Sequence, residues 1–563
     1  MPTEKRDLKT DLAEYINRRM SNLIAMQNPD GSFGAYPYSN AKYPFHIMAF
    51  ALKKMPGSAW HASAQLEAAL IRTLEHYYNV IEDDGRTEFY GMGGFKWGKN
   101  LTDGWPLFCW QEALRLLEPD LPPGLFRRHR EKIAKIIAMH FDEVNRKISA
   151  DHDPFKTRVH NLLVWDALML YRAGMLWRNE AWQALGTDVL RKACKAQQPD
   201  GWWSEYGPIV GYSLVTATAI SLYCEWSGDK DALIAMERAA GYHDAFAYPD
   251  GTMIETIDGR MRYHPGIMMY LPPSFSRFPA GRDYLERAVR TLAKEDVFEV
   301  PHIQGFSFLG FVYEHLTDAP PDVVQGRQFI VMPALHSAVA RPGRWCCALC
   351  GYENCTSTGG FYLERQNLLS VWHAQTGLIA GGGHSNYQPE FSSFNVIDRK
   401  GILYYLHADP RILSREREMT LALSYGGLPV SIFVHLIDDR RIAIRYSAES
   451  FTSDTFARYA VRANLILAAR PGTPIRCKTL DANLDGTSLS WTEENFRNGI
   501  EHNGWRLRIP PRKNESVAVK WPFYPYNSYR TDRKSELKEA AIIASAQLFP
   551  DEPAIEYEIE ILA

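Results

Sequence analysis

The segment Gln197-Gln-Pro-Asp-Gly201-Trp202-Trp203-Ser-Glu205-Tyr206-Gly-Pro-Ile-Val-Gly211-Tyr212 runs from a tight turn into a stretch of helical character. Its Pro-Asp-Gly core is turn chemistry, because Pro presets φ, Asp bonds back to the backbone and Gly tolerates positive φ. The turn recurs at Gln27-Asn-Pro-Asp-Gly31 and, shortened, at Pro249-Asp-Gly251. Repetition of helix, turn and helix predicts stacked helical hairpins, and the irregular intervals favour a closed α/α toroid over an open solenoid.

Apolar spacings of three and four predict helices through roughly the first 315 residues. The clearest stripes are Leu66, Leu70 and Leu74, and then Leu285, Ala288, Val289 and Leu292. Beside the second stripe, the charged residues Glu286, Arg287 and Arg290 are expected on the opposite, solvent-facing side of the helix.

After about residue 325 the apolar period changes to two, which is typical of strands with one buried face. Examples are Trp505, Leu507 and Ile509, and then Ile555, Tyr557, Ile559 and Ile561. Few helical crossovers separate these strands, so the sheets are expected to be antiparallel. The predicted fold class is therefore α+β and multidomain, with an incomplete (α/α) toroid over residues 1–325 and an antiparallel β-sandwich over 326–563.

The composition is that of a globular protein, with 46% hydrophobic and 23% charged residues over 563 positions. A net charge of −3 provides no overall basic field, so nucleic acid is not expected as a partner. The charged start, from Met1 to Met20, lacks the apolar core of a signal peptide, and no membrane segment is evident. As written, the sequence predicts a cytoplasmic protein, or a periplasmic or secreted one if a leader has been removed.

Familiar cofactor and metal motifs are absent from the sequence. No Walker A loop, dinucleotide-binding glycine motif, serine-hydrolase elbow or His-Glu-x-x-His motif occurs. Cys346, Cys347, Cys350 and Cys355 form a cluster, but no second pair follows at zinc-finger spacing. Reduced thiols at the start of a β-region are the expected interpretation. No cofactor is required by the prediction and no metal ligand is assigned, although a structural metal at this cluster stays open.

Three segments combine polar and aromatic side chains in positions where the periodic pattern predicts either core or cleft. The first contains Arg158, His160 and Asn161 at the start of an expected helix, where Asn is also a frequent cap. The second is the Trp202–Tyr212 segment, whose aromatic rings can stack on sugars or simply pack in a core. The third places His384 after three glycines, where backbone can approach a ligand closely.

On these segments the sequence resembles the heparinase II/III-like polysaccharide lyases, which include the oligoalginate lyases. Those proteins combine an α/α toroid with an antiparallel β-sandwich, and they carry an Asn, a Tyr and a β-domain His in comparable positions. The resemblance implies catalytic roles for His160, Asn161, His384 and either Tyr212 or Tyr206. Asn386 stands where the family often has a metal-binding Asp, so the resemblance implies no metal site here.

The implied reaction is β-elimination next to a uronic acid in an anionic oligo- or polysaccharide. Asn161 would bind the uronate carboxylate and stabilise the enolate-like charge that develops when the C5 proton leaves. Tyr212 and His384 are the candidate bases, and a Tyr hydroxyl suits protonation of the leaving oxygen. If proton and leaving group share a face, one Tyr can serve both steps; if they do not, His384 is the base and Tyr212 the acid.

Further side chains are expected to bind the substrate. Arg260, Arg262 and His264 follow the third Pro-Asp-Gly turn and can pair with carboxylates, although a solvated loop with local salt bridges is the simpler alternative. Trp202, Trp203 and Glu205 are assigned to the same role.

Other functions fit parts of the sequence. A glycoside hydrolase acting on uronides would need paired carboxylates, with Asp103, Asp166 and Glu205 as candidates. A uronyl C5-epimerase shares the proton-abstraction step. A carbohydrate-binding protein or a terpene-cyclase-like toroid is also compatible with the helical repeats, but the Asn, Tyr and His set favours the lyase.

Overall fold

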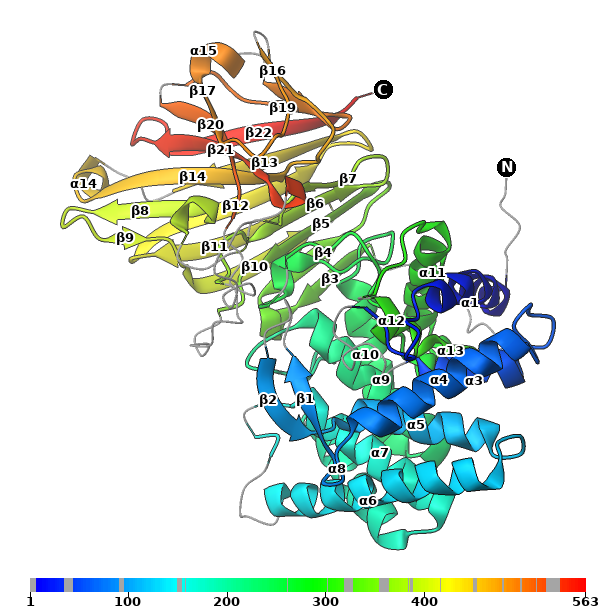
Figure 1. Cartoon of the computed structure of the whole chain (residues 1–563). Coiled ribbons are helices and arrows are strands. Elements are labelled where there is room, and N and C mark those ends of the chain that lie inside the picture. Colours follow the sequence, from blue (N-terminus) through cyan, green and yellow to red (C-terminus); the bar gives the residue numbers. More distant parts are fainter. Residues whose placement is uncertain are drawn as a thin grey trace.

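A computed structural model of the chain describes residues 7–34, 44–90, 96–148, 154–156, 158–260, 262–300, 302–317, 328–353, 364–382, 384, 388–415, 417–448, 453–477, 480–496, 499–512, 514–522 and 537–562. The helical region occupies the N-terminal half and the strands the C-terminal half (Figure 1). The predicted fold class is therefore confirmed. The change from helices to strands falls between His315 and Phe329, and the predicted boundary at 325 and 326 lies outside the described residues.

An inner ring of helices forms the centre of the helical domain. Its members are α3 (Phe45–Lys54), α5 (Gly104–Leu117), α7 (Asn161–Trp177), α9 (Val210–Ser227) and α13 (Leu309–His315). Helix α3 contacts α5, α5 contacts α7, and α7 contacts α9. The 3₁₀ helix η2 (Pro273–Arg277) joins α9 to α13, which returns to α3. Helix α9 is buried on nearly all sides, as expected for a helix with neighbours all round.

Outer helices cover this ring. They are α1 (Leu8–Ala25), α4 (Ala64–Val80), α6 (Pro123–Ile148), α8 (Glu180–Lys195), α10 (Lys230–Ala245) and α11 (Pro279–Lys294), with the short α12 (His302–Phe306) nearby. The predicted Leu66, Leu70 and Leu74 stripe is buried in α4, as expected. In α11 the prediction for Arg287 was wrong. This residue is buried, because its guanidinium pairs with Asp244 and donates to the carbonyl of Tyr248.

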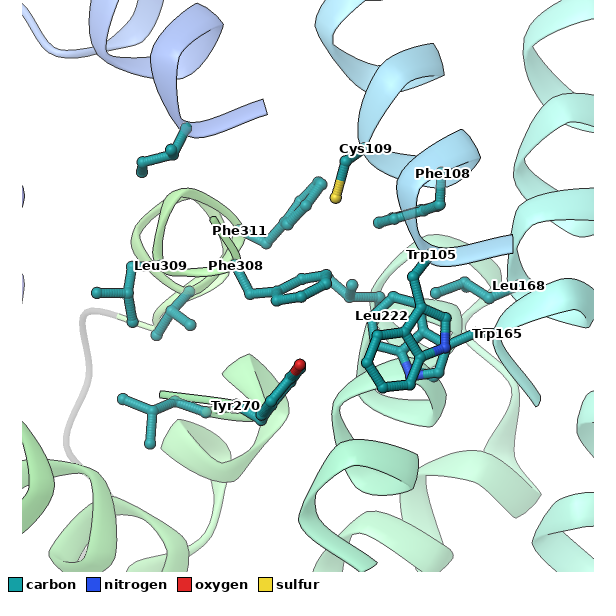
Figure 2. Close-up of a cluster of buried hydrophobic side chains, with 14 of the residues drawn as sticks. Trp105, Phe108, Cys109, Trp165, Leu168, Leu222, Tyr270, Phe308, Leu309 and Phe311 are labelled. Carbon is teal, nitrogen blue, oxygen red and sulfur yellow. The ribbon is translucent and has the colours of Figure 1, made fainter. Parts of the chain in front are cut away.

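Aromatic side chains fill the middle of the ring (Figure 2). The rings of Trp105 and Trp165 lie 5.4 Å apart, and Trp165 lies 4.9 Å from Phe308. Tilted and edge-to-face contacts of this kind suit the quadrupoles of aromatic rings. The ring centre is therefore packed core.

Two antiparallel sheets form the C-terminal domain. The strand order in the first is β10 (Ala408–Arg415), β11 (Glu418–Tyr425), β12 (Leu428–Leu436), β13 (Arg441–Ser447), β22 (Ala554–Ile561), β19 (Trp505–Arg508), β18 (Ile500–His502), β15 (Ile475–Cys477) and β16 (Leu480–Ala482). The order in the second is β17 (Leu489–Thr492), β20 (Glu515–Lys520), β21 (Ala541–Leu548), β14 (Tyr459–Ala468), β7 (Gly377–Ala380), β6 (Leu369–His373), β5 (Trp345–Cys350), β4 (Ser337–Ala340) and β3 (Phe329–Met332). Strands β8 (Phe394–Asp398) and β9 (Leu403–Tyr404) extend it beside β14.

The period-two predictions hold in this domain. In β22, Ile555, Tyr557 and Ile559 are buried while the alternating glutamates are more exposed, and β19 pairs with β22 in the same pattern. The buried faces of both sheets contribute to one apolar cluster. This is the arrangement of a sandwich, in which each strand has one dry face.

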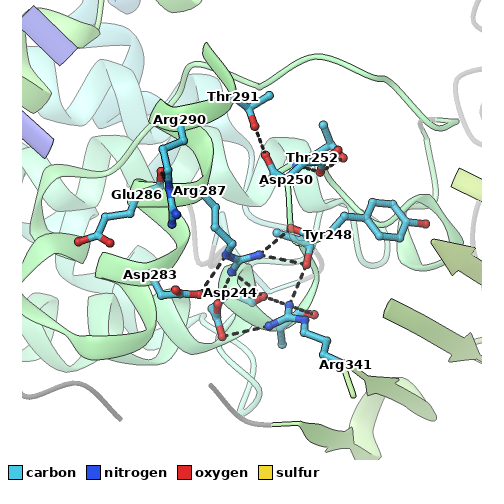
Figure 3. A network of polar contacts seen from close by, with 12 residues as sticks. Asp244, Tyr248, Asp250, Thr252, Asp283, Glu286, Arg287, Arg290, Thr291 and Arg341 are labelled. Atoms are coloured by element: carbon cyan, nitrogen blue, oxygen red, sulfur yellow. Dashed lines mark hydrogen bonds and ion pairs between the residues drawn. The ribbon is translucent and has the colours of Figure 1, made fainter. Parts of the chain in front are cut away.

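The two domains meet across a separate apolar cluster that contains Trp202, Tyr248 and Ile254 from the helical side and Val339, Cys346 and Trp372 from the sheet side. An ionic network lies beside it (Figure 3). Arg341, just after β4, donates to the carbonyls of Ala245 and Ala247 at 2.8 Å and faces the Asp244 carboxylate at 3.6 Å. The sheet domain is thus fixed to the C-terminal end of α10.

Two further findings concern the described part of the chain. None of its helices is long and apolar enough to cross a membrane. Cys346, Cys347 and Cys350 are buried free thiols on β5, and no cluster of potential metal ligands occurs among the described residues; Cys355 lies outside them.

Candidate active site

Backbone contacts bring the first two predicted segments together. The N–H of Val159 donates to the carbonyl of Ser204 at 2.6 Å, so the segment before α7 runs beside the segment before α9. Asn161 is the first residue of α7, after His160 in the capping position. Its side chain does not cap the helix. Instead its Nδ2 donates to Oε2 of Glu205 at 3.2 Å, in a buried setting.

The loop after the third Pro-Asp-Gly turn joins the same place. The N–H of Gly259 donates to the carbonyl of Pro208 at 2.9 Å. Asp258 accepts from the N–H of Arg260 at 2.8 Å through Oδ1 and from the N–H of Gly211 at 3.4 Å through Oδ2. Asp258 therefore links the Arg260 loop to the start of α9, one residue before Tyr212.

Glu205 lies between two potential carboxylate-binding groups. Besides the Asn161 amide, the Arg260 guanidinium lies 3.5 Å from Oε1 of Glu205. Burial raises the pKa of Glu205, and the Arg260 charge and the Asn161 hydrogen bond only partly oppose this effect. Two donors that suit a substrate carboxylate are thus held by a carboxylate of the protein itself.

Both candidate tyrosines stack with an arginine. The Arg260 guanidinium carbon lies 4.3 Å from the centre of the Tyr212 ring, and that of Arg158 lies 4.8 Å from the Tyr206 ring. Tyr206 has φ of +66°, a left-handed conformation that is strained for a bulky side chain. Strain of this kind is retained where the surrounding structure requires one particular side-chain direction.

An open cleft of about 1220 Å³ extends from His160 and Tyr206. Its other walls are α6 and the hairpin of β1 (Arg86–Tyr90) and β2 (Lys96–Leu101). Burial, followed by the nearby Arg158 charge, lowers the pKa of His160 to about 4, so this ring is neutral at neutral pH. Asn161 follows His160 in the chain and Glu205 precedes Tyr206, and both Asn161 and Glu205 are buried behind the cleft wall.

His384 lies at the domain boundary and is only 1% exposed. Its Nδ1 accepts from the backbone N–H of Gln366 at 3.4 Å, which leaves the proton of the neutral ring on Nε2. Burial lowers its pKa to about 3. His384 is not among the residues that line the cleft, and its neighbours 385–387 lie outside the described residues.

The remaining predicted binding residues are dispersed. Trp203 is buried in the helical core and its Nε1 donates to the carbonyl of Ala193 at 2.8 Å, while Trp202 packs between the domains. Arg262 pairs with Glu539 of the sheet domain at 3.2 Å. His264 is exposed, and its Nδ1 accepts from the N–H of Gly266 at 3.1 Å. None of these four lines the cleft, and neither do Glu205, Arg260, Asn161 or Tyr212; of the predicted site residues, His160 and Tyr206 form its wall.

Two of the hydrolase candidates, Asp103 and Asp166, do line it. Oδ1 of Asp166 accepts from the N–H of Gly104 at 3.1 Å and lies 3.4 Å from Nδ1 of His140. Burial disfavours the charged form of His140, but Asp166 outweighs that effect and raises the His140 pKa. The carboxylate of Asp166 is thus already engaged in holding the start of α5.

Three residues that hold the Glu255–Arg260 loop in place were not predicted from the sequence. Asp258 connects the Arg260 loop to α9, as described above. Arg365 of the sheet domain donates to the carbonyls of Thr256 and Ile257 at 3.0 and 2.7 Å. Glu255 accepts from Ser370 at 2.8 Å and from the N–H of Gly382 at 3.0 Å, close to His384 in the chain. No local pattern marks these roles, because each depends on a contact between distant segments.

Comparison with known proteins places the fold. The chain resembles the chondroitin AC lyase of Streptomyces coelicolor, solved in complex with chondroitin sulphate, with 13% identity and a TM-score of 0.52 over 100% of this chain and 80% of that one. It resembles heparinase III with 13% identity and a TM-score of 0.52, over 100% and 86% of the two chains. It also resembles a Paenibacillus xanthan lyase, with 12% identity and a TM-score of 0.51 over 98% of this chain and 57% of that one. No protein-family profile matches the sequence, and neither does any curated protein. The chain therefore has the fold of the heparinase-like polysaccharide lyases.

Proposed function

We propose that the protein is a carbon–oxygen lyase that cleaves the glycosidic bond next to a uronic acid by β-elimination and leaves an unsaturated uronate end. The observation that carries the proposal is the meeting of Asn161, Glu205, Arg260 and Tyr212 beside an open cleft. The fold supports it, since the structures that it resembles are polysaccharide lyases. The partner is an anionic, uronate-containing oligo- or polysaccharide.

The first task of the site is to neutralise the uronate carboxylate. The C5 proton is too weakly acidic while the adjacent carboxylate carries its full charge. We assign the Asn161 amide and the Arg260 guanidinium to that carboxylate, which takes over the donors that Glu205 holds in the free enzyme. Donors fixed in a largely buried site stabilise the enolate-like charge as it develops.

The second task is proton transfer, which we assign to Tyr212. As a phenolate it takes the C5 proton, the C4–O4 bond breaks, and the resulting hydroxyl donates its proton to O4 of the departing sugar. The Arg260 guanidinium carbon lies 4.3 Å from the centre of the Tyr212 ring, so the group assigned to the substrate carboxylate also contacts the group assigned to proton transfer. We choose the same-face route because Tyr212 contacts Arg260, which also faces Glu205, whereas His384 contacts the backbone of Gln366 in the sheet domain. In this proposal His384 has a structural role: it is buried at the domain boundary and accepts a hydrogen bond from the backbone of Gln366.

The remaining assignments follow from position. His160 and Tyr206 line the cleft and contact the sugar, with Arg158 stacked on Tyr206. Arg262 and His264 border the same loop as Arg260 and are proposed to bind more distant parts of the substrate. For Trp202 and Trp203 we propose a supporting role, since both rings are buried.

The test is ultraviolet absorbance of the conjugated double bond, followed over time with a panel of uronate polymers and oligomers. Tyr212→Phe is expected to lower kcat by at least about 100-fold, the usual scale for loss of an acid–base group. Asn161→Ala is expected to act similarly. Tyr313→Phe, on α13 and outside the cleft lining, is the matched control.

Each other outcome has a defined meaning. New reducing ends without absorbance would favour the hydrolase and its candidates Asp103, Asp166 and Glu205. Exchange of the C5 proton with deuterated solvent, without cleavage, would favour the epimerase. Full activity of Tyr212→Phe would remove Tyr212 from the mechanism.

A further inference from the structure

The charges on the cleft walls determine which kinds of sugar can bind on either side of the reacting uronate. Among the described residues that line the cleft, the cations are Arg86, Lys99, Arg146, Lys147 and Arg158. The carboxylates are Asp84, Asp103, Asp142, Glu143 and Asp166. Five positive and five negative groups leave no formal excess of either sign.

Most of these cations already have a carboxylate beside them. Glu143 lies 2.7 Å from Arg146 and 3.4 Å from Lys147. Arg86 lies 3.7 Å from Asp84, and Lys99 pairs with Glu82. Of the two lining histidines, His160 is neutral at neutral pH, because burial lowers its pKa to about 4. Asp166 lies 3.4 Å from His140 and raises the His140 pKa, so a positive charge on this ring is neutralised locally by that carboxylate.

A polyanionic substrate fits such walls poorly. A second uronate or a sulfate carries only acceptors, so it would have to displace carboxylates of the protein from their cations and would face like charge along the cleft. A sugar hydroxyl both donates and accepts, so it can bond to a carboxylate and to a cation of the same wall at once. The chain as a whole, with a net charge of −3, provides no attracting field for a polyanion either.

The proposed reacting subsite differs from these charge-balanced walls. There Asn161 and Arg260 both face one carboxylate position, which Glu205 occupies in this structure. We infer that the cleft takes an oligosaccharide in which a single uronate is flanked by neutral sugars, and that the enzyme discriminates against polyuronates and sulfated glycosaminoglycans. This inference rests on the proposed function for the identity of the reaction, and it adds the class of substrate.

The first experiment compares kcat/KM, by ultraviolet absorbance, for a uronate oligosaccharide with neutral neighbours, a homopolyuronate and a sulfated glycosaminoglycan of equal length. The neutral-flanked substrate is expected to be preferred by at least about ten-fold. Raising NaCl from about 50 to 200 mM should lower kcat/KM for the neutral-flanked substrate by roughly three-fold, as expected when binding releases about one counterion. A substrate held by three or more charges would lose a much larger factor.

The charge of the wall is tested by Glu143→Gln, which removes the negative charge that lies beside Arg146 and Lys147. The ratio of kcat/KM for the homopolyuronate to that for the neutral-flanked substrate is expected to rise several-fold. Glu131→Gln, an exposed substitution on the same helix but outside the cleft lining, should leave the ratio at its wild-type value. No change with Glu143→Gln would contradict the charge argument.

A binding measurement separates this inference from the proposed function. Calorimetric titration of the Tyr212→Phe variant with the same oligosaccharides needs no turnover, and tighter binding of the neutral-flanked one is expected. Preference for a polyanion in binding or cleavage would overturn the inference and leave the lyase standing. Binding without elimination on any substrate would overturn the lyase alone. Binding of neither class would overturn both.

Discussion

At the scale of single residues, the two tyrosines of the Trp202–Tyr212 segment are distinguished by their surroundings. Tyr212 contacts Arg260, which also pairs with Glu205, whereas Tyr206 contacts Arg158 and lines the cleft. The left-handed backbone at Tyr206 turns its ring to this position at a cost of about 1–2 kcal/mol for a residue other than glycine. Tyr206 forms part of the cleft wall, and the proposed mechanism assigns proton transfer to Tyr212.

Substitutions at Tyr206 test this division. Tyr206→Phe is expected to retain most of kcat, because phenylalanine keeps the ring on which the Arg158 guanidinium stacks. Tyr206→Gly should unfold at the same or a higher temperature, since glycine relieves the backbone strain, while kcat/KM falls about ten-fold as the wall is lost. A calorimetric scan beside steady-state kinetics checks both. A Tyr206→Phe variant as inactive as Tyr212→Phe would exchange the roles of the two tyrosines.

Glu205 is expected to make substrate binding depend on pH. Burial raises its pKa, so its negative charge, which competes with the substrate for Asn161 and Arg260, appears only above the range of an ordinary glutamate. KM should therefore rise as pH increases through this raised pKa. Glu205→Gln removes the competing charge and should flatten that rise. A steeper dependence of KM on pH in the variant would show that Glu205 assists binding in its charged form.

At the scale of elements, the three Pro-Asp-Gly turns have one common structure. The N–H of Gly31, Gly201 and Gly251 each donates to the carbonyl three residues earlier. Gln27 and Gln197, which begin the two longer copies, each donate through Nε2 at 2.8 Å to the carbonyls of Ala69 and Ala235 on outer helices. The second turn leads directly to Glu205 and Tyr206 and the third to Arg260, so the repeat places site residues at one end of the toroid.

The glycine of the second turn has no room for a side chain. Gly201 has φ of +97°, and a β-carbon there would lie 2.2 Å from the carbonyl oxygen of Arg238. Gly201→Ala is expected to destabilise the protein by about 3 kcal/mol or more, since both strain and overpacking act against it. Chemical denaturation measures the change.

Gly228 supplies the matched control for this substitution. It has φ of +64° and nothing within 4 Å of the added carbon, so Gly228→Ala should cost only about 1 kcal/mol. Equal losses for the two variants would show that close packing against α10 contributes nothing.

At the scale of the whole molecule, buried polar groups at the boundary hold the helical domain and the sheet domain in a fixed relative position. Glu255 accepts from Tyr248 of its own domain and from Ser370 and Gly382 of the other, and burial raises its pKa. Arg341 reaches three carbonyls at the end of α10. Because these contacts cross the boundary, the sheet domain positions the loop from Glu255 to Arg260.

Removal of Arg341 should uncouple the domains. Arg341→Ala leaves Asp244 paired with Arg287, so no buried charge loses its last partner. The expected cost of about 1–3 kcal/mol comes from the carbonyls of Ala245 and Ala247, which lose their donor. Calorimetry should then resolve two unfolding transitions in place of one. Arg344→Ala, an exposed change three residues further on, is the control and should shift the profile little. A single unshifted transition for Arg341→Ala would show that the apolar cluster alone couples the domains.

Buried histidines should make the fold sensitive to acid. Burial lowers the folded-state pKa of His46, His243 and His384 to about 3 and that of His160 and His407 to about 4. Below pH 6.5 the unfolded chain binds protons that the folded chain does not, so stability is lost as pH falls from 6.5 toward 4. Each histidine contributes about 1.4 kcal/mol per pH unit in that window. Denaturation midpoints between pH 7 and 4.5 measure the loss, and stability that rises on acidification would contradict it.

The sequence by itself determined the two-domain plan, because apolar periods of 3.6 and 2 are local patterns that each element must satisfy to bury one face. It also determined the turns, since proline and glycine restrict φ locally, and it brought Asn161, Tyr212 and Arg260 into consideration. Only the tertiary structure decided that Arg287 is buried, that Trp203 is core and that His384 is enclosed. It alone joined Asn161 to Glu205 across 44 positions and Arg365 to Thr256 across 109. The physical reason is that burial and electrostatics depend on neighbours in space, and these come from segments whose separation along the chain carries no signal.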